Sequence, residues 1–171
     1  MGRGLSTRDD APFDDPAFTI WGVTDIGRDM IGRRFDAFFE LHDESEITEA
    51  SMQWYARQTK PIYMQAYRSD IQASITFPLP CVVKMFGRYF TSTVAYMIAM
   101  AMLHGCEDLH LYGVDMGRVG KRLATPDPYG YQRSCCEYLL GFARGRGVNV
   151  YVPEKSALLK APALYGYEEK G

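Results

Sequence analysis

The stretch that decides the fold is TSTVAYMIAMAMLHGCEDLHLYGVD, residues 91–115. Its first part predicts a helix over 92–104, because three hydroxyl residues can cap the start and Gly105 can close the end in the left-handed conformation. The side chains between these ends are apolar on nearly every side of a helix. This helix is therefore expected to lie deep against a sheet.

The same stretch continues into a predicted strand, 108–115, which ends in a Gly-Val-Asp turn. Elsewhere, short apolar runs also alternate with helix-length segments, a pattern typical of parallel strands joined by crossover helices. The sequence thus predicts one α/β domain, 1–171, with a small Rossmann-like, doubly wound and mostly parallel sheet of about five strands. The expected strands are 18–23, 35–41, 61–65, 108–115 and 148–152, and the expected helices are 48–58, 80–86, 92–104 and 132–144.

Two further segments have no predicted helix or strand. Residues 116–130 hold several glycines and prolines and predict a loop. The tail, 156–171, carries scattered apolar residues and is expected to pack back on the body.

The composition is that of an ordinary globular protein, with 47% hydrophobic and 23% charged residues. A net charge of −2 provides no basic excess to neutralise phosphates, so general nucleic-acid binding is not expected. No apolar run approaches the ~20 residues that span a bilayer, and the N-terminus lacks the apolar core of a signal peptide. We therefore expect a cytoplasmic protein without a membrane partner.

Several common kinds of site have no counterpart in the sequence. The four cysteines form no C-x-x-C pair and are expected to be reduced and mostly buried, and the three histidines do not fall at zinc-ligand spacings. The phosphate-binding loop of P-loop kinases, the Gly-x-Ser-x-Gly elbow of hydrolases and a strand-borne Gly-x-Gly-x-x-Gly are also absent. No metal is expected.

Ligands of doubly wound sheets bind outside the carboxyl ends of the strands, which selects the candidate residues. In the N-terminal run, Gly4, Ser6 and Thr7 could approach a phosphate, although a frayed terminus has a similar composition. Thr24 and Asp25 follow the first strand. They could hydrogen-bond a base or ribose, or simply cap a turn.

Two candidate segments concern acid–base chemistry and anion binding. His42 follows the second strand and could act as an acid or base near neutral pH, although a surface histidine is equally expected there. Thr91, Ser92 and Thr93, with Arg88 nearby, could bind an anion at the start of the buried helix through free amides and the helix dipole. Capping alone would also explain these hydroxyls.

The last candidates lie on either side of the predicted loop. Gly113 and Asp115 end a buried strand, where the carboxylate could accept hydrogen bonds from ribose, orient a nucleophile or cap the loop. Tyr131 and Arg133 open the next helix, and the loop before them could act as a lid. Tyrosines are also common in loops that flank a core.

The stretch 91–115 resembles the corresponding part of bacterial sialyltransferases that use a CMP-activated sugar. It also resembles the motility accessory factors that glycosylate flagellin and the pterin pyrophosphokinase-like group. These proteins share a hydroxyl-rich start, a buried helix ending in Gly, and a strand closing in Gly-Ile/Val-Asp. Nearly the whole chain resembles a group of uncharacterised tailed-phage proteins, through 21–25, 39–43 and 164–167. The resemblance implies nucleotide contacts at Gly4, Ser6, Thr7, Thr91, Ser92, Thr93 and Asp115.

The chain departs from the sialyltransferase pattern in three places. The family has an apolar strand before its glycine-rich loop, whereas this sequence starts at the loop. The asparagine that contacts the nucleotide is replaced by Thr24 or lost. The catalytic histidine is missing from 128–133, where Tyr131 is a poor base because its pKa is ordinarily near ~10. Nucleotide binding thus transfers more safely than catalysis.

Three functions follow as hypotheses. The first is a nucleotide-dependent, glycosyltransferase-like enzyme, phage-encoded by the resemblance. His42 or Asp115 would be its base, Tyr131 a further catalytic candidate, and Arg88 and Arg133 would stabilise the departing phosphate. The second is a protein that sequesters a nucleotide unchanged, and the third is a phage structural protein. The ligand would be a nucleotide or nucleotide-activated small molecule, with no separate cofactor. An open strand edge makes a homodimer a candidate assembly.

Overall fold

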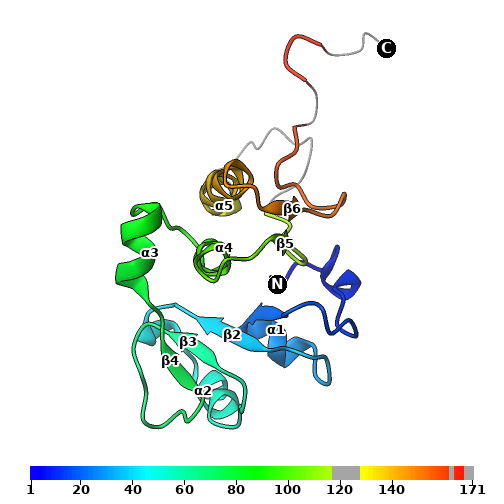
Figure 1. The fold of residues 1–171 in the computed structure, drawn as a ribbon. Helices are drawn as coiled ribbons and strands as arrows, with labels where there is room; N and C mark the ends of the chain where they lie inside the picture. The colour runs from blue at the N-terminus through cyan, green and yellow to red at the C-terminus, as the bar shows by residue number, and fades with distance from the viewer. Residues whose placement is uncertain (117–127, 162–163, 168–171) are drawn as a thin grey trace.

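The computed structural model describes residues 1–116, 128–161 and 164–167. Within these ranges the chain is mixed α/β, and all its paired strands are parallel (Figure 1). In chain order the elements are η1 (Arg8–Asp10), β1 (Trp21–Val23), α1 (Thr24–Asp29), β2 (Ala37–Glu40), η2 (Glu44–Glu46), α2 (Glu49–Tyr55), β3 (Ile62–Met64), β4 (Ser74–Thr76), α3 (Leu79–Phe86), α4 (Thr93–Leu103), β5 (Asp108–His110), α5 (Pro128–Gly145) and β6 (Asn149–Tyr151).

The strands form two parallel sheets instead of the single sheet of about five strands that the sequence predicts. One sheet has the order β1-β2-β3-β4, and the other pairs β5 with β6. In the first sheet Gly22 lies opposite Phe38, and Phe38 opposite Ile62. The prediction of parallel strands is confirmed, whereas the single sheet of about five strands is not.

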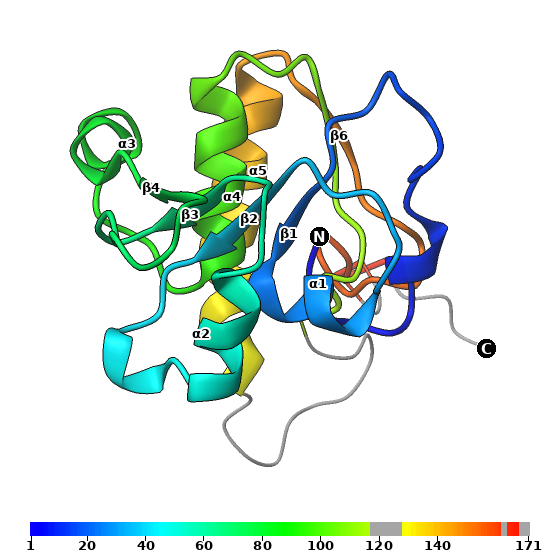
Figure 2. The ribbon, with the colours of Figure 1, turned by 90° about the horizontal axis from the view of Figure 1, so that it is seen from below.

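The N-terminal segment lies between the two sheets. The amino group of Met1 donates to the carbonyl of Trp21 in β1, and the Met1 carbonyl accepts from the amide of Val23. On its other side, the Gly2 amide donates to Tyr112, just after β5. Figure 2 shows the N-terminus beside β1. Backbone hydrogen bonds thus connect the sheets through the first residues of the chain.

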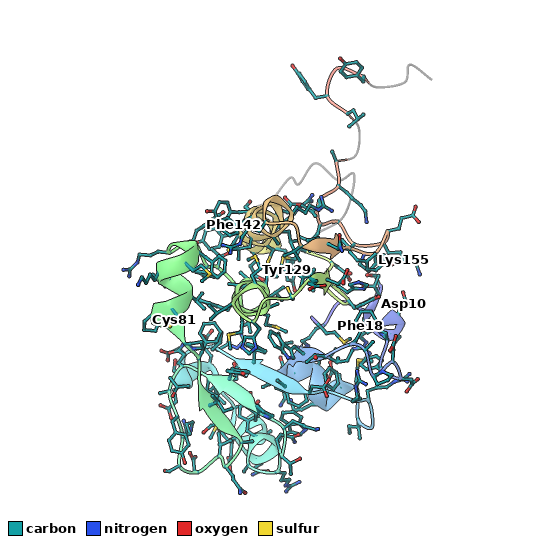
Figure 3. All side chains as sticks on the ribbon, viewed as in Figure 1. Asp10, Phe18, Cys81, Tyr129, Phe142 and Lys155 are labelled. Atoms are coloured by element: carbon teal, nitrogen blue, oxygen red, sulfur yellow. The ribbon has the colours of Figure 1, made fainter. Side chains whose placement is uncertain are left out.

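The core consists of two apolar clusters, one on each face of the larger sheet. Successive residues of a strand point to opposite faces, so Phe39 packs in the cluster with α4 and α5, whereas Phe38 packs with α1 and α2. Figure 3 shows side chains filling the space between α4, the sheet and α5. The helices thus cover both faces of the sheet, as in other α/β folds.

Helix α4 confirms the strongest sequence prediction. The Ser92 hydroxyl accepts from the Ala95 amide at 3.2 Å, so Ser92 caps the helix. Gly105 has φ of +74°, the left-handed conformation expected after a helix end. Met97, Ile98 and their neighbours are buried. The end residues and the apolar surface were therefore sufficient to locate this helix.

Several boundaries differ from the prediction. Helix α1 and strand β4 were not predicted, because each is too short to produce a clear period. Helix α5 begins at Pro128, so the predicted loop ends before 128, and 117–127 lies outside the described residues. In the tail, Leu158 is buried as expected, whereas Tyr165 is 98% exposed. The prediction that the tail packs on the body is therefore wrong for 164–167.

Candidate functional site

A cleft of about 1110 Å³ lies at the carboxyl ends of β1, β2 and β5. Its walls come from the N-terminal segment, the β1–α1 junction, the residues after β2, the start of α4, the residues after β5 and the start of α5. This location is where the sequence predicted a ligand site. Segments far apart in the chain thus meet in one cavity, which we call the cleft.

The N-terminal wall of the cleft is a tight loop. Gly4 donates its amide to the Gly113 carbonyl at 2.7 Å, and Ser6 donates its hydroxyl to the Asp115 carboxylate. The buried Thr7 hydroxyl accepts from the Gly113 amide at 2.9 Å. A Cβ on Gly4 would lie 2.4 Å from an Asp115 oxygen and 2.9 Å from the Gly113 carbonyl. Only glycine therefore fits where this loop crosses the end of the β5 segment.

The opposite wall begins at the N-terminus of α4. Thr91, Ser92 and Thr93 all line the cleft. Ser92 uses its oxygen for the cap, and Thr91 donates its hydroxyl to the carbonyl of Tyr131 in α5 at 3.1 Å. An eleven-residue helix presents its positive dipole end and its first amides at this wall, which suits an anionic group.

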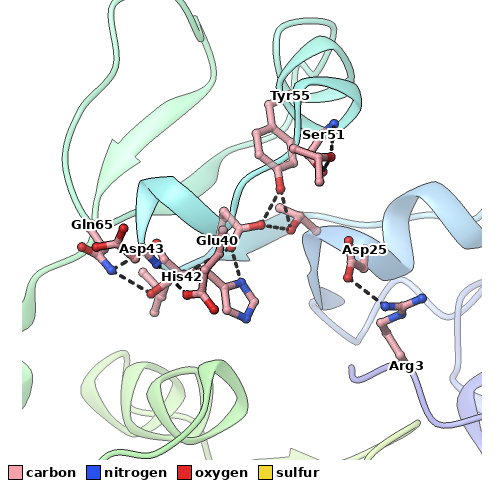
Figure 4. A network of polar contacts seen from close by, with 12 residues as sticks. Arg3, Asp25, Glu40, His42, Asp43, Ser51, Tyr55 and Gln65 are labelled. Carbon is pink, nitrogen blue, oxygen red and sulfur yellow. Dashed lines mark hydrogen bonds and ion pairs between the residues drawn. The ribbon is translucent and has the colours of Figure 1, made fainter.

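The third wall carries a histidine paired with a buried carboxylate. The Nδ1 atom of His42 lies 2.6 Å from Oε1 of Glu40, and the amide of His42 also donates to this oxygen at 3.3 Å (Figure 4). The Glu40 side chain is 5% exposed, whereas that of His42 is 58% exposed and lines the cleft. Glu40 therefore orients an imidazole whose other nitrogen is available to the cleft.

Two further donors reach the second oxygen of Glu40 from inside the fold. Thr24 donates its hydroxyl at 2.5 Å, and Tyr55 in α2 donates its phenol to the same oxygen and to Thr24. Burial raises the pKa of Glu40, but the hydrogen bonds from His42, Thr24 and Tyr55 outweigh it and lower the pKa to about 2. Glu40 is thus a buried, ionised carboxylate.

The same pair changes the basicity of the histidine. The hydrogen bond to Glu40 raises the pKa of His42, and burial opposes this rise only in part. The nearby carboxylates of Glu46 and Asp25 raise it further. A carboxylate in this position fixes the tautomer of a histidine and stabilises its protonated form, as the carboxylate of a Ser-His-Asp triad does.

Asp25 belongs to a charged group on the rim of the cleft. Its carboxylate accepts from Arg3 at 2.9 Å and from Arg28, while Arg3 also lies 3.6 Å from Asp29. Figure 4 shows the Arg3–Asp25 pair near His42. Because these charges are paired, Asp25 offers hydrogen-bond acceptors to a ligand and little net charge.

Most residues selected from the sequence lie together in the structure. The cleft is lined by Gly4, Thr24, Asp25, His42, Thr91, Ser92, Thr93, Gly113 and Asp115. Ser6 and Thr7 lie behind its wall, where they hold Asp115 and Gly113. The prediction that the carboxyl ends of the strands bring these segments together thus agrees with the geometry.

Besides Ser6 and Thr7, three selected side chains are not among the residues that line the cleft. Arg88 is exposed before α4, and Tyr131 is 70% exposed on α5. Arg133 donates to Glu137 and to the Lys160 carbonyl, both at 2.8 Å, so it holds the C-terminal segment on α5. The side chains of Tyr129 and Gln132 line the cleft from this helix instead.

Arg3 and Glu40 lie in segments that the sequence selected, but neither was named as a site residue, and Tyr55 was missed altogether. Glu40 is a charged residue in an otherwise apolar strand, which is a signal that a buried carboxylate needs partners. The partners of Tyr55 and Arg3 have no comparable signal, because they lie 15 and 22 residues away in the chain.

The described residues contain no group of three or more histidine, cysteine and carboxylate side chains placed to hold a metal ion. In the same part of the chain, the helices are all too short or too polar to cross a bilayer. Comparison of the chain with protein-family models, with curated proteins and with solved structures finds no match. The function therefore has to be argued from the cleft itself.

Proposed function

We propose that the chain is a nucleotide-dependent transferase of Rossmann-like type, glycosyltransferase-like, in which His42 is the general base. The observation that carries this proposal is the His42–Glu40 pair, which lies in the same cleft as the N-terminus of α4. Transfer of a group from a nucleotide phosphate to an acceptor requires a base for the acceptor and a binding site for the departing phosphate. A histidine and a helix N-terminus in one cavity are suited to these two tasks.

The chemistry follows from the hydrogen bonds of His42. With Nδ1–H donated to Glu40, Nε2 carries the lone pair and can take the proton of an acceptor hydroxyl as its oxygen attacks the activated carbon. The bond from that carbon to the nucleotide phosphate breaks, and its electrons leave on the phosphate oxygen. The ionised Glu40 stabilises the imidazolium that forms, as the carboxylate of a triad does.

The departing phosphate fits the end of α4. Its first amides and the Thr93 hydroxyl provide donors that are already in place, so little reorganisation accompanies the build-up of negative charge. The carboxylate of Asp115, opposite Gly4, is suited to ribose hydroxyls. This side of the proposal also agrees with the nucleotide contacts that the sialyltransferase resemblance implies.

The test begins with a thermal-shift screen of CMP, UMP, GMP, AMP, their di- and triphosphates and common sugar nucleotides. A ligand at about 100 times its Kd stabilises the folded state by about 2.7 kcal/mol. For a chain of this size, such a gain raises Tm by roughly 5–10 °C. Absence of any shift would contradict nucleotide binding.

Turnover then separates the enzyme from a protein that returns its nucleotide unchanged. We expect His42→Gln to keep the thermal shift and to lose turnover by about 10²–10⁴-fold, the usual contribution of a general base. His104→Gln is the matched control, because His104 is an exposed histidine at the far end of α4 and should keep both properties. Equal turnover in the two variants would remove His42 from the mechanism.

A further inference from the structure

A second cavity, of about 750 Å³, lies between β1 and β5 on the side away from the cleft. Thr19 and Trp21 line it from the β1 edge, and Asp108 and His110 line it from the β5 edge. Met97 and Ala101 of α4 form one face, and Phe18 lies on another. We call this cavity the slot.

The slot lies between the two sheets, next to Met1, the first residue of the N-terminal segment. Met1 bonds to β1 through Trp21 and Val23, and the next residue, Gly2, bonds to Tyr112 after β5. Successive residues of a central strand bond alternately to the neighbours on either side, so the chain already runs here as a strand parallel to both. The slot continues the line of this strand backwards from Met1.

The edges of the slot have the hydrogen-bonding pattern of such a strand. The backbone amide of Asp36, before β2, donates to the Ile20 carbonyl. Because successive residues of a strand direct their backbone groups to opposite sides, the Thr19 carbonyl and the Trp21 amide face the slot. On the other side, Leu111 donates to Tyr151 in β6, which turns the His110 carbonyl toward the slot. Two parallel edges thus face each other across the space of one strand.

The chemistry at the end of the slot points the same way. Burial lowers the pKa of the Met1 amino group to about 5, because a charged amine is costly where water is excluded. An amide at this nitrogen would carry no charge and could donate to Trp21 in the same direction. A chain in the slot would have apolar walls on both faces, which is the environment of a buried parallel strand.

We propose that the slot binds an extended, apolar polypeptide segment that is joined to the nitrogen of Met1 and runs parallel to β1 and β5, uniting the two sheets into one. The direction in which the segment runs determines how it can be joined to Met1, because only a carboxyl end can form a peptide bond with the Met1 nitrogen. A parallel segment would bring its carboxyl end to Met1, whereas an antiparallel segment would bring its amino end there.

Occupation of the slot would also affect the cleft. Met1 and Gly2 lead directly into Gly4, whose amide bonds to Gly113, and into Ser6, which bonds to Asp115. Fixing the segment before Met1 would therefore fix the loop on the cleft wall. If the cleft binds a nucleotide, a fixed loop should also raise the affinity for it. This expected gain rests on the proposed function, whereas the effect on the loop does not.

The experiment compares three forms of the chain: as described, extended before Met1 by Lys-Val-Ile-Val-Val, and extended by the matched sequence Lys-Ser-Gly-Ser-Gly. We expect the apolar extension to raise Tm by about 5 °C or more relative to the Ser/Gly extension. Amide exchange of Gly2 and Gly4 should slow by tenfold or more in the same form. Both readouts are independent of any nucleotide and of turnover.

Two outcomes would overturn the proposal. If both extensions give the same Tm and the same exchange rates, the slot does not accept a strand joined to Met1. If the free, acetylated apolar pentapeptide stabilises the unextended chain as much as the fused extension does, the slot is a docking site for a separate partner.

Discussion

The imidazole of His42 and the carboxylate of Glu40 lie 2.6 Å apart at the end of β2, with the carboxylate buried and the imidazole open to the cleft. Glu40 is held from behind by Thr24 and Tyr55, which come from α1 and α2. The carboxylate that orients His42 is thus itself held by two further side chains. The protonation of His42 therefore depends on the partners of Glu40, and this dependence can be measured.

Replacement of Glu40 by Gln should lower the pKa of His42. The folded pKa of His42 lies above its ordinary value of 6.5 because of the bond to Glu40. The protonated pair thus contributes stability that is complete below about pH 6.5 and is lost as the pH rises through the folded pKa. An NMR titration of the His42 ring measures the pKa directly. An unchanged pKa in Glu40→Gln would show that the pair is not formed in solution.

Removal of the Tyr55 hydroxyl should destabilise the protein most above about pH 4.5, where Glu40 is ionised, and less in acid. Tyr55→Phe leaves the buried Glu40 carboxylate with one donor fewer, at a cost of about 1.5–3 kcal/mol. The lowered pKa of Glu40 contributes stability above about pH 4.5 that is lost as the pH falls toward about 2. Because the variant raises this pKa, the difference in stability between the two proteins should shrink as the pH falls below about 4.5.

Urea unfolding at a series of pH values tests this prediction. Tyr63→Phe is the matched control, because Tyr63 is a half-buried tyrosine stacked on Phe39 whose ring contact the substitution preserves. The same loss in both variants would mean that the Tyr55 hydroxyl does not stabilise Glu40 specifically.

Two substitutions of Ser92 separate helix capping from anion binding. Asn and Asp cap helices about equally well, so Ser92→Asn and Ser92→Asp should have similar Tm values. They differ by one negative charge at the N-terminus of α4, where the proposed phosphate binds. We expect Ser92→Asp to bind inorganic pyrophosphate at least five-fold more weakly than Ser92→Asn, as measured by calorimetry. Equal affinities would place the phosphate elsewhere.

Substitution of Gly4 should damage the loop on the cleft wall. A Cβ at this position would approach the Gly113 carbonyl to 2.9 Å, and this backbone atom cannot rotate away. We expect Gly4→Ala to cost about 1–3 kcal/mol in chemical unfolding, as other overpacked sites do. In Gly141→Ala, a control in α5 with open space around the glycine, the change should instead stabilise by up to about 1 kcal/mol. A neutral Gly4→Ala would contradict the described loop.

The four thiols should differ sharply in reactivity. Burial raises the pKa of Cys136 to about 12, and the pKa of Cys135 is also raised by burial. Both side chains are fully buried, whereas Cys81 is exposed on α3. Labelling of the native protein with iodoacetamide, followed by peptide mass spectrometry, should modify Cys81 first. Rapid labelling of Cys136 would show that α4 and α5 separate in solution.

The sequence alone determined the elements with strong local signals. Helix α4 follows from its cap at Ser92, its end at Gly105 and its apolar surface. The parallel strands follow from apolar runs that alternate with helices. Because parallel strands end at a common edge, the sequence also selected most residues of the cleft, including His42 and Asp115. Local propensity and the geometry of parallel sheets were sufficient for these predictions.

Only the tertiary structure decided which residues pair across long separations. Gly4 meets Gly113 and Ser6 meets Asp115 because the N-terminal segment lies between two sheets, an arrangement that no local pattern encodes. Glu40 likewise acquires Tyr55 through the packing of α2 on the sheet. Hydrogen bonds between distant residues depend on the relative positions of whole elements. The packing of side chains from many elements sets these positions, so a local pattern along the chain does not reveal them.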